Sequence, residues 1–239
     1  YNTKYSTNIK VHVDTNKQLE ILKYLENKAI DTRNLIKHEE SSSLSNINDL
    51  SVQVEEGFRI ISDAFPSLGG TYSKPKYSLY NQVFDGFGLE GRYYILTNEV
   101  SINKNIPDIY RPFMVSKYMA YQRGIAREDE AAFFAYLVGI NNTNPSVKYS
   151  AYVSILSMMT KSMMFDNKVE YNYFVSNMDK DIRADMDKIS DYRAKNGPGK
   201  KIADQVKYVF KRINGDLRVD SLEKEVSILM SSYYSLFTY

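Results

Sequence analysis

The stretch that decides the fold, residues 117–136, reads KYMAYQRGIAREDEAAFFAY. Gly124 divides it, because glycine readily adopts the left-handed backbone conformation that often ends a helix. Pro112 suits the first turn of the preceding helix, which we predict over residues 111–124. A second helix is predicted from about Arg127, because apolar residues recur on one face. That face carries Ala131, Phe134, Ala135 and Val138. We therefore expect two consecutive helices joined at Gly124.

Residues 71–110 depart from this helical pattern and predict a small sheet. Aromatic and branched residues gather there in short runs, as is typical of strands. The runs cover residues 77–80, 93–96 and 100–103. Glycines at positions 86, 88 and 91 permit tight turns between them. Since no helix is expected to open directly after these glycines, their spacing is not a dinucleotide-binding fingerprint.

Helical periodicity dominates the rest of the chain. The predicted helices cover residues 16–40, 49–64, 146–164, 169–177, 179–195, 199–212 and 220–237. The expected fold class is α+β and mostly helical, with the small sheet just upstream of the 111–124 helix. We expect residues 1–66 to form a helical segment packed on a main domain of residues 67–239, in one compact unit.

The composition excludes several classes of function. Charged residues make up 25% and hydrophobic residues 43% of the 239 residues, as in ordinary globular proteins. A net charge of +2 supplies no strong positive field for phosphates, so we expect no nucleic-acid partner. The absence of cysteine excludes disulfides, thiolate metal sites and cysteine nucleophiles.

Other features of the composition favour an extracytoplasmic domain. A chain without cysteine avoids stray oxidation, and 21 tyrosines with many Asn and Lys residues resemble the usage of low-GC bacteria. No run of about 18 apolar residues is present to span a membrane. The start at Tyr1 lacks both an initiator Met and the apolar core of a signal peptide. We expect an ectodomain attached to a membrane through segments absent from this chain.

The stretch KYMAYQRGIAREDEAAF at residues 117–133 resembles the hallmark H-E-x-A-H-Q-x-G-[FI]-x-R-E-D-E-A-N-F. That hallmark belongs to an uncharacterised bacterial family of membrane-anchored proteins, regarded as zinc-dependent peptidases of the zincin type. Other segments are similar to the family in the same order along the chain. They are residues 97–103, Pro112-Phe113, Tyr149–Tyr152, and residues 210–215 and 219–221. The resemblance covers roughly residues 58–237 and is specific over 97–152.

The resemblance implies a zinc site whose ligand positions are occupied here by other residues. It places zinc ligands at Lys117 and Tyr121, the general base at Tyr118, and a third ligand at Glu130, with Glu128 as the second candidate. A catalytic zinc needs three protein ligands and an open position for water. A protonated lysine offers no lone pair, and a tyrosine cannot replace a glutamate as general base. We therefore expect no zinc, no other cofactor and no peptidase activity.

Several alternatives stay open at these positions. The two histidines, His12 and His38, are far apart in the sequence and do not form a ligand pair. Lys117 is expected either to pair with Glu130, bridging the two helices in place of a metal, or to point into solvent. Tyr118 and Tyr121 either line a peptide groove or pack as ordinary half-buried rings. The methionines at 158, 159, 163 and 164 are expected to fill gaps in the core.

The segment Thr97-Asn98-Glu99-Val100-Ser101 is the expected binding groove. In zincins, the edge strand above the active-site helix holds an extended substrate through backbone hydrogen bonds, and this mode of binding needs no metal. We thus expect an inactive peptidase-like domain on the extracytoplasmic side of a membrane that binds a peptide or protein. The alternatives are a structural domain of a membrane complex, or an active metallopeptidase with a relocated metal.

Overall fold

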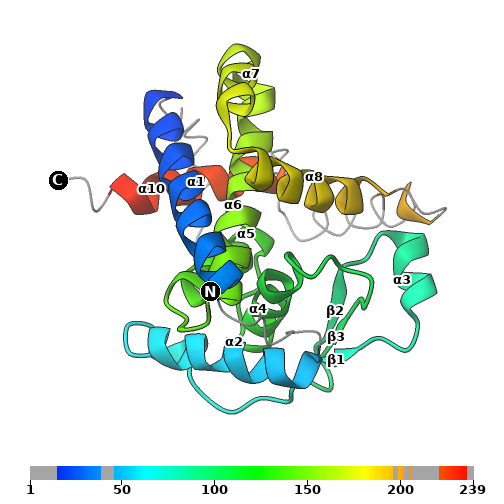
Figure 1. Cartoon of the computed structure of the whole chain (residues 1–239). Helices are drawn as coiled ribbons and strands as arrows, with labels where there is room; N and C mark the ends of the chain where they lie inside the picture. The colour runs from blue at the N-terminus through cyan, green and yellow to red at the C-terminus, as the bar shows by residue number, and fades with distance from the viewer. Residues whose placement is uncertain (1–14, 39–45, 196–198, 202–204, 206–220, 236–239) are drawn as a thin grey trace, which may run out of the picture.

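The computed structural model describes residues 15–38, 46–195, 199–201, 205 and 221–235. The helices are α1 (Thr15–His38), α2 (Ile47–Ile61), α3 (Asn81–Phe87), α4 (Arg111–Gln122), α5 (Glu128–Ile140), α6 (Pro145–Asp166), α7 (Lys168–Asn177), α8 (Lys180–Ala194) and α10 (Leu222–Ser235), with a 3-10 turn at Pro66–Leu68. The strands are β1 (Lys76–Tyr77), β2 (Gly91–Tyr94) and β3 (Glu99–Ile102). A mostly helical α+β fold with one small sheet is therefore confirmed (Figure 1).

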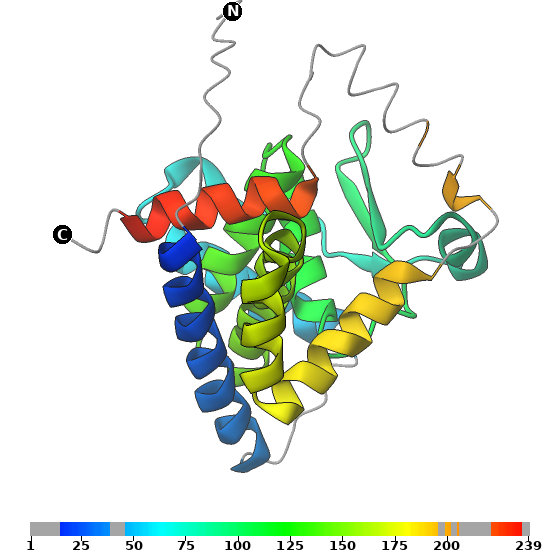
Figure 2. The ribbon, with the colours of Figure 1, turned by 90° about the horizontal axis from the view of Figure 1, so that it is seen from above.

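Helix α6 forms the centre of the helical body. It begins at Pro145, where the side chain of Asn144 accepts hydrogen bonds from the amides of Ser146 and Val147. Its residues are buried on nearly every side, which is expected of a helix with other helices packed around it. Helices α1, α4, α5, α8 and α10 all contact it. Figure 2 shows α10 (red) beside the first turns of α1 (blue).

The sheet has the order β1-β3-β2, so β3 is its central strand. β1 runs parallel to β3, and β2 runs antiparallel to it. Val100 and Ile102 of β3 point into the core, while the alternate residues Glu99 and Ser101 are partly exposed. Helix α4 contacts β2 and β3 as well as α5 and α6, so it connects the sheet to the helical body.

The structure differs from the sequence-based prediction mainly around the sheet. The predicted strand at 77–80 is reduced to Lys76–Tyr77, and helix α3 at Asn81–Phe87 was not predicted. Gly88, with φ of +63°, ends α3 as a left-handed cap, so a glycine interpreted as a turn between strands instead ends a helix. The predicted helix at 199–212 lies mostly outside the described residues.

The first two helices lie against the rest of the chain. α1 packs along α6, and α2 packs against α5 and α4. A division into residues 1–66 and 67–239 stays a prediction. Three of the four methionines of α6 fill the core as expected, since Met158, Met159 and Met163 are buried. Within the described ranges, no helix combines the length and apolarity needed to cross a bilayer.

Candidate functional site

Helix α4 is held at both ends by specific contacts. At its start, the amide of Phe113 donates to Oγ of Ser150 on α6, at 3.0 Å, and so satisfies one of the unpaired amides of the first turn. At its end, Gly124 adopts φ of +88°, which confirms the predicted left-handed cap. Nearly every residue of α4 is buried, including Lys117. The side chain of Lys117 therefore lies in the interior and not in solvent.

Lys117 pairs with Glu128, the first residue of α5. Its Nζ atom lies 3.0 Å from Oε1 of Glu128, and the lysine side chain is 2% exposed. The predicted pair of Lys117 with Glu130 is therefore wrong. Successive residues of a helix are rotated by about 100°, so Glu130 lies on another face of α5. There it is 41% exposed and pairs with Arg127 at 3.2 Å.

The environment of Lys117 keeps it protonated. Burial alone would lower the pKa of Lys117, but the negative charge of the neighbouring Glu128 outweighs this effect. As a result the pKa stays well above its ordinary value. The lone pair that a metal ion would need is therefore occupied by a proton.

The two tyrosines beside Lys117 are packed against each other and against the sheet. The rings of Tyr118 and Tyr121 meet edge to face, with centroids 5.5 Å apart. The ring of Tyr118 also lies against Gly91, the first residue of β2. Burial raises the pKa of Tyr118 well above its ordinary value and that of Tyr121 to about 12. Both phenols are therefore neutral at physiological pH. Neither can replace the carboxylate of a general base or the imidazole of a zinc ligand.

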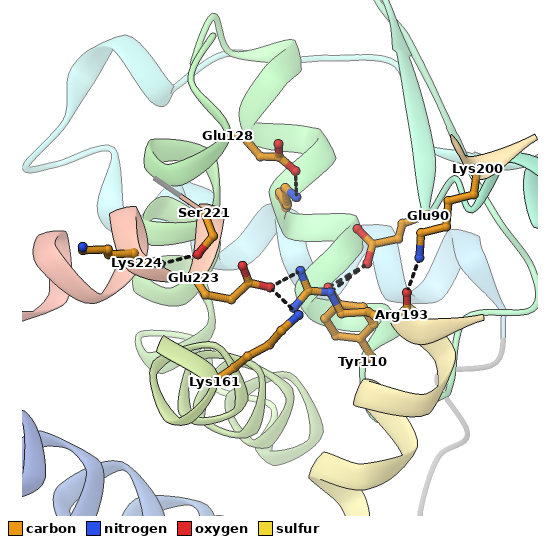
Figure 3. A network of polar contacts seen from close by, with 10 residues as sticks. Glu90, Tyr110, Glu128, Lys161, Arg193, Lys200, Ser221, Glu223 and Lys224 are labelled. Atoms are coloured by element: carbon orange, nitrogen blue, oxygen red, sulfur yellow. Dashed lines mark hydrogen bonds and ion pairs between the residues drawn. The ribbon is translucent and has the colours of Figure 1, made fainter. Parts of the chain in front are cut away.

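A separate network of polar contacts links the starts of β2 and α4 to the C-terminal helices (Figure 3). Tyr110, just before α4, donates to Oε1 of Glu90 at 3.0 Å. Arg193 at the end of α8 lies 3.6 Å from the same Glu90 oxygen and 3.1 Å from Glu223 of α10. Lys161 of α6 pairs with Glu223 at 3.0 Å.

Sequence reasoning did not find this network. Glu90, Arg193 and Glu223 come from three distant parts of the chain. Charged residues are usually solvated, so nothing local distinguished these three. Arg193 and Lys161 outweigh the effect of burial on Glu223 and lower the pKa of its carboxyl group. The carboxylate of Glu223 is thus stabilised in its charged form.

The predicted binding segment lies next to the end of α4, but its strand is not an edge. Thr97 and Asn98 form the turn between β2 and β3, and the amide group of Gln122 donates to the carbonyl oxygen of Asn98 at 2.9 Å. Glu99, Val100 and Ser101 belong to β3, which pairs with β1 on one side and β2 on the other. β3 therefore lies between two strands, although β1 pairs with it only at Ser101 and Ile102, and the expectation that it is an edge strand is wrong.

β2 is the edge strand that runs beside α4. The amide of Asn103 donates to the carbonyl of Glu90 at 3.0 Å, so Glu90 and Asn103 form a hydrogen-bonded pair. Such pairs recur every second residue in an antiparallel ladder, so Arg92 and Ser101 form the next one. In an antiparallel pair the intervening residues direct their backbone groups outward. The N–H and C=O groups of Gly91 and Tyr93 thus point away from β3, to a side with no described strand.

A second buried cation, Arg123, fixes the far end of α4. Its guanidinium donates to the carbonyls of Leu68 and Met119 at 3.0 Å each, and pairs with Glu55 at 2.6 Å. The guanidinium carbon also lies 3.9 Å from the ring centre of Phe58 and 4.5 Å from that of Tyr72. These contacts join α4 to α2 and to the segment before β1.

The described residues contain no group of three or more His, Cys, Asp or Glu side chains arranged to hold a metal ion. His12 lies outside the described residues. His38 is the last residue of α1, and its side chain is likewise not described. The other positions at which the resemblance places zinc ligands hold Lys117, Tyr121, Glu130 and Glu128.

Comparison with known families gave a match. The model of the family described as protein of unknown function (DUF3810) matches residues 1–217. Neither the search of curated proteins nor the search of solved structures gave a match. Because the match covers most of the chain, this protein belongs to the DUF3810 family of proteins of unknown function.

Proposed function

We propose that this chain is a catalytically inactive, zincin-like domain that binds an extended peptide or protein segment. One observation carries the proposal: β2, which has no strand on its outer side among the described residues, runs beside α4, where Lys117, Tyr118 and Tyr121 stand at positions that resemble a zinc-peptidase motif. We further propose that the protein is membrane-anchored, with this domain on the extracytoplasmic side. The resemblance of residues 97–152 to the membrane-anchored peptidase family supports that location.

The loss of peptidase activity is supported by the chemistry of the α4 positions. The ammonium group of Lys117 is already paired with Glu128, and it has no free electron pair for zinc. Tyr118 is a neutral phenol packed on Gly91, so it has no carboxylate to take a proton from a metal-bound water.

Peptide binding is supported by the geometry of β2. An extended peptide that adds to a sheet edge gains backbone hydrogen bonds, and its alternate side chains give specificity. On β2 the outward backbone groups of the partly exposed Tyr93 are placed for this role, whereas Gly91 is buried. Arg92 and Tyr94 lie on the exposed face, so they are available to contact alternate side chains of the peptide.

The test is a displayed library of extended peptides, followed by titration of a selected peptide against two variants. Tyr93→Pro removes the ring and the outward N–H group, whereas Tyr93→Ala removes the ring alone. Proline is tolerated on the open side of an edge strand, so both variants should fold. One net hydrogen bond corresponds to about 0.5–1.5 kcal/mol, so Tyr93→Pro should bind about two- to tenfold more weakly than Tyr93→Ala. Equal affinities of the two variants, or a library without binders, would contradict the proposal.

A role in the assembly of a membrane complex is the second candidate. Exposed apolar side chains favour it: Leu79 is 94% exposed, and Ile95 and Leu96 at the β2–β3 turn are 79% and 99% exposed. The two candidate functions are sensitive to different variants. If assembly is the function, Ile95→Ser with Leu96→Ser disrupts the complex extracted from native membranes, and Tyr93→Pro leaves it intact.

A further inference from the structure

The loop that leads into β2 is held by residues far along the chain. Arg193 lies 3.6 Å from Glu90, the residue just before β2. The backbone of the same region contributes as well, because the amide of Gly199 donates to the carbonyl of Gly86 at 2.8 Å. Lys200 donates to the carbonyl of Arg193 at 2.6 Å, and its aliphatic chain lies against Gly88. The start of β2 is thus fixed from the C-terminal side of α8.

The guanidinium group of Arg193 also binds α10. Its Nη2 atom lies 3.1 Å from Oε1 of Glu223, in the first turn of that helix. α10 is seated by apolar contacts too, since Val226 and Met230 are fully buried. Figure 3 shows Arg193 between Glu223 on one side and Glu90 on the other. One side chain therefore bridges α10 to the strand that carries the outward backbone groups.

We propose that Arg193 is a positioning residue for the β2 edge, and that it transmits changes at α10 to that edge. The proposal rests on the proposed function, since it names a residue that sets the position of the binding strand. A planar guanidinium with several donors can hold two carboxylates at once, whereas a lysine ammonium acts as a single point charge. Tyr110 adds to the arrangement by donating to Glu90, so the carboxylate is held from two directions.

Lys161 offers a matched control. It pairs with the same Glu223 carboxylate at 3.0 Å, but the structure gives it no contact with Glu90. Lys161→Met therefore removes one ion pair of Glu223 and leaves the bridge through Arg193 in place. Glu223→Gln, by contrast, removes the charge that Arg193 binds on α10 and does not touch the sheet.

Hydrogen exchange measured by mass spectrometry tests the proposal on the full chain without any peptide ligand. Exchange of the amides in residues 90–94 that face β3, those of Arg92 and Tyr94, should rise about tenfold in Arg193→Met and about threefold in Glu223→Gln, because local opening becomes easier. Lys161→Met should leave these amides at the wild-type rate. Arg193→Lys should recover part of the protection, because lysine binds one of the two carboxylates.

Three outcomes would overturn the proposal: wild-type exchange of residues 90–94 in Arg193→Met, wild-type exchange in Glu223→Gln, or an increase in Lys161→Met equal to that in Glu223→Gln. The last outcome would mean that general loosening of α10 explains the effect, and exchange of the α10 amides in each variant measures such loosening. Since exchange is measured without a peptide, a failure to find peptide binders would count against the proposed function and not against this coupling.

Discussion

Lys117 of α4 and Arg123, just after its last residue, are both buried cations, but they differ in how many partners surround them. Arg123 has a side chain with 0% exposure, two carbonyl acceptors, a carboxylate and two aromatic rings around it. Lys117 is almost as buried, but within the described part of the chain it has one carboxylate, and that carboxylate is 25% exposed. Arg123 therefore has a structural role that several contacts fix. Lys117 has one partner, so a residue of different chemistry could take its position.

The difference shows which part of a site a chain can change without losing its fold. Arg123 joins α4, α2 and the segment before β1, so its replacement affects three elements at once. Lys117 joins α4 to the first residue of α5, and water can reach its partner. A buried ion pair of this second kind contributes little net stability, so its residues are free to change with function.

The largest effect is expected from Arg123→Met. Two carbonyl groups lose their donor and Glu55 loses its partner, so the free energy of unfolding should fall by about 3 kcal/mol. Urea unfolding measures this value, with Arg59→Met at an exposed position of α2 as a control expected to change it by less than about 0.5 kcal/mol. A loss below about 1 kcal/mol for Arg123→Met would remove the contrast with Lys117.

An intermediate effect is expected when the α4 positions receive imidazoles. In Lys117→His with Tyr121→His, two histidines lie one turn apart on the face of α4 next to Glu128, which can supply a third ligand. This variant should bind about one zinc ion per chain. At a free zinc concentration of 100 times Kd, it should gain about 2.7 kcal/mol of stability.

Two further variants decide between the carboxylates of α5 in that zinc experiment. Added Glu128→Gln should weaken zinc binding at least tenfold, because it removes a ligand, and added Glu130→Gln should leave it unchanged. Calorimetric titration with zinc gives each affinity. If Glu130→Gln weakens zinc binding instead, then Glu130 is the third ligand, as the sequence predicted.

The smallest effect concerns Lys117 itself and its dependence on pH. Since the folded pKa of Lys117 is raised, its contribution to stability is present below the unfolded value near pH 10 and is lost as pH rises through the folded value. Lys117→Met should cost about 1 kcal/mol at pH 7, because the partly exposed Glu128 becomes hydrated. Above about pH 10.5 the difference between wild type and variant in thermal unfolding should shrink. A difference that grows with pH would contradict the stabilising role of the pair.

The sequence was sufficient where a feature depends on neighbouring residues. The end of α4 two residues before the left-handed Gly124 and the start of the next helix near Arg127 follow from local backbone preferences. The partner of Lys117 does not follow from local preferences. It depends on where α5 begins, because a shift of two residues along that helix moves a side chain to another face. Strand order is a similar case: local pattern predicts that β3 exists, and tertiary pairing decides that it is central.

The charged network was beyond prediction for a related reason. Arg193 is separated from Glu90 by more than 100 residues, and its role appears when α8 packs near the start of β2. Helix α3 was missed because it is short and carries Gly86, a poor helix former.

The contact of Tyr118 with Gly91 also limits which residues these two positions accept together. A Cβ atom at position 91 would lie 2.7 Å from Cε2 of the Tyr118 ring and 3.0 Å from the carbonyl oxygen of Ser101. A residue larger than glycine at 91 would therefore require the Tyr118 ring to move, and it would still lie close to the carbonyl oxygen of Ser101. Glycine at 91 leaves room for a small or a large residue at 118, so the glycine is what allows the Tyr118 ring to pack directly on the backbone of β2.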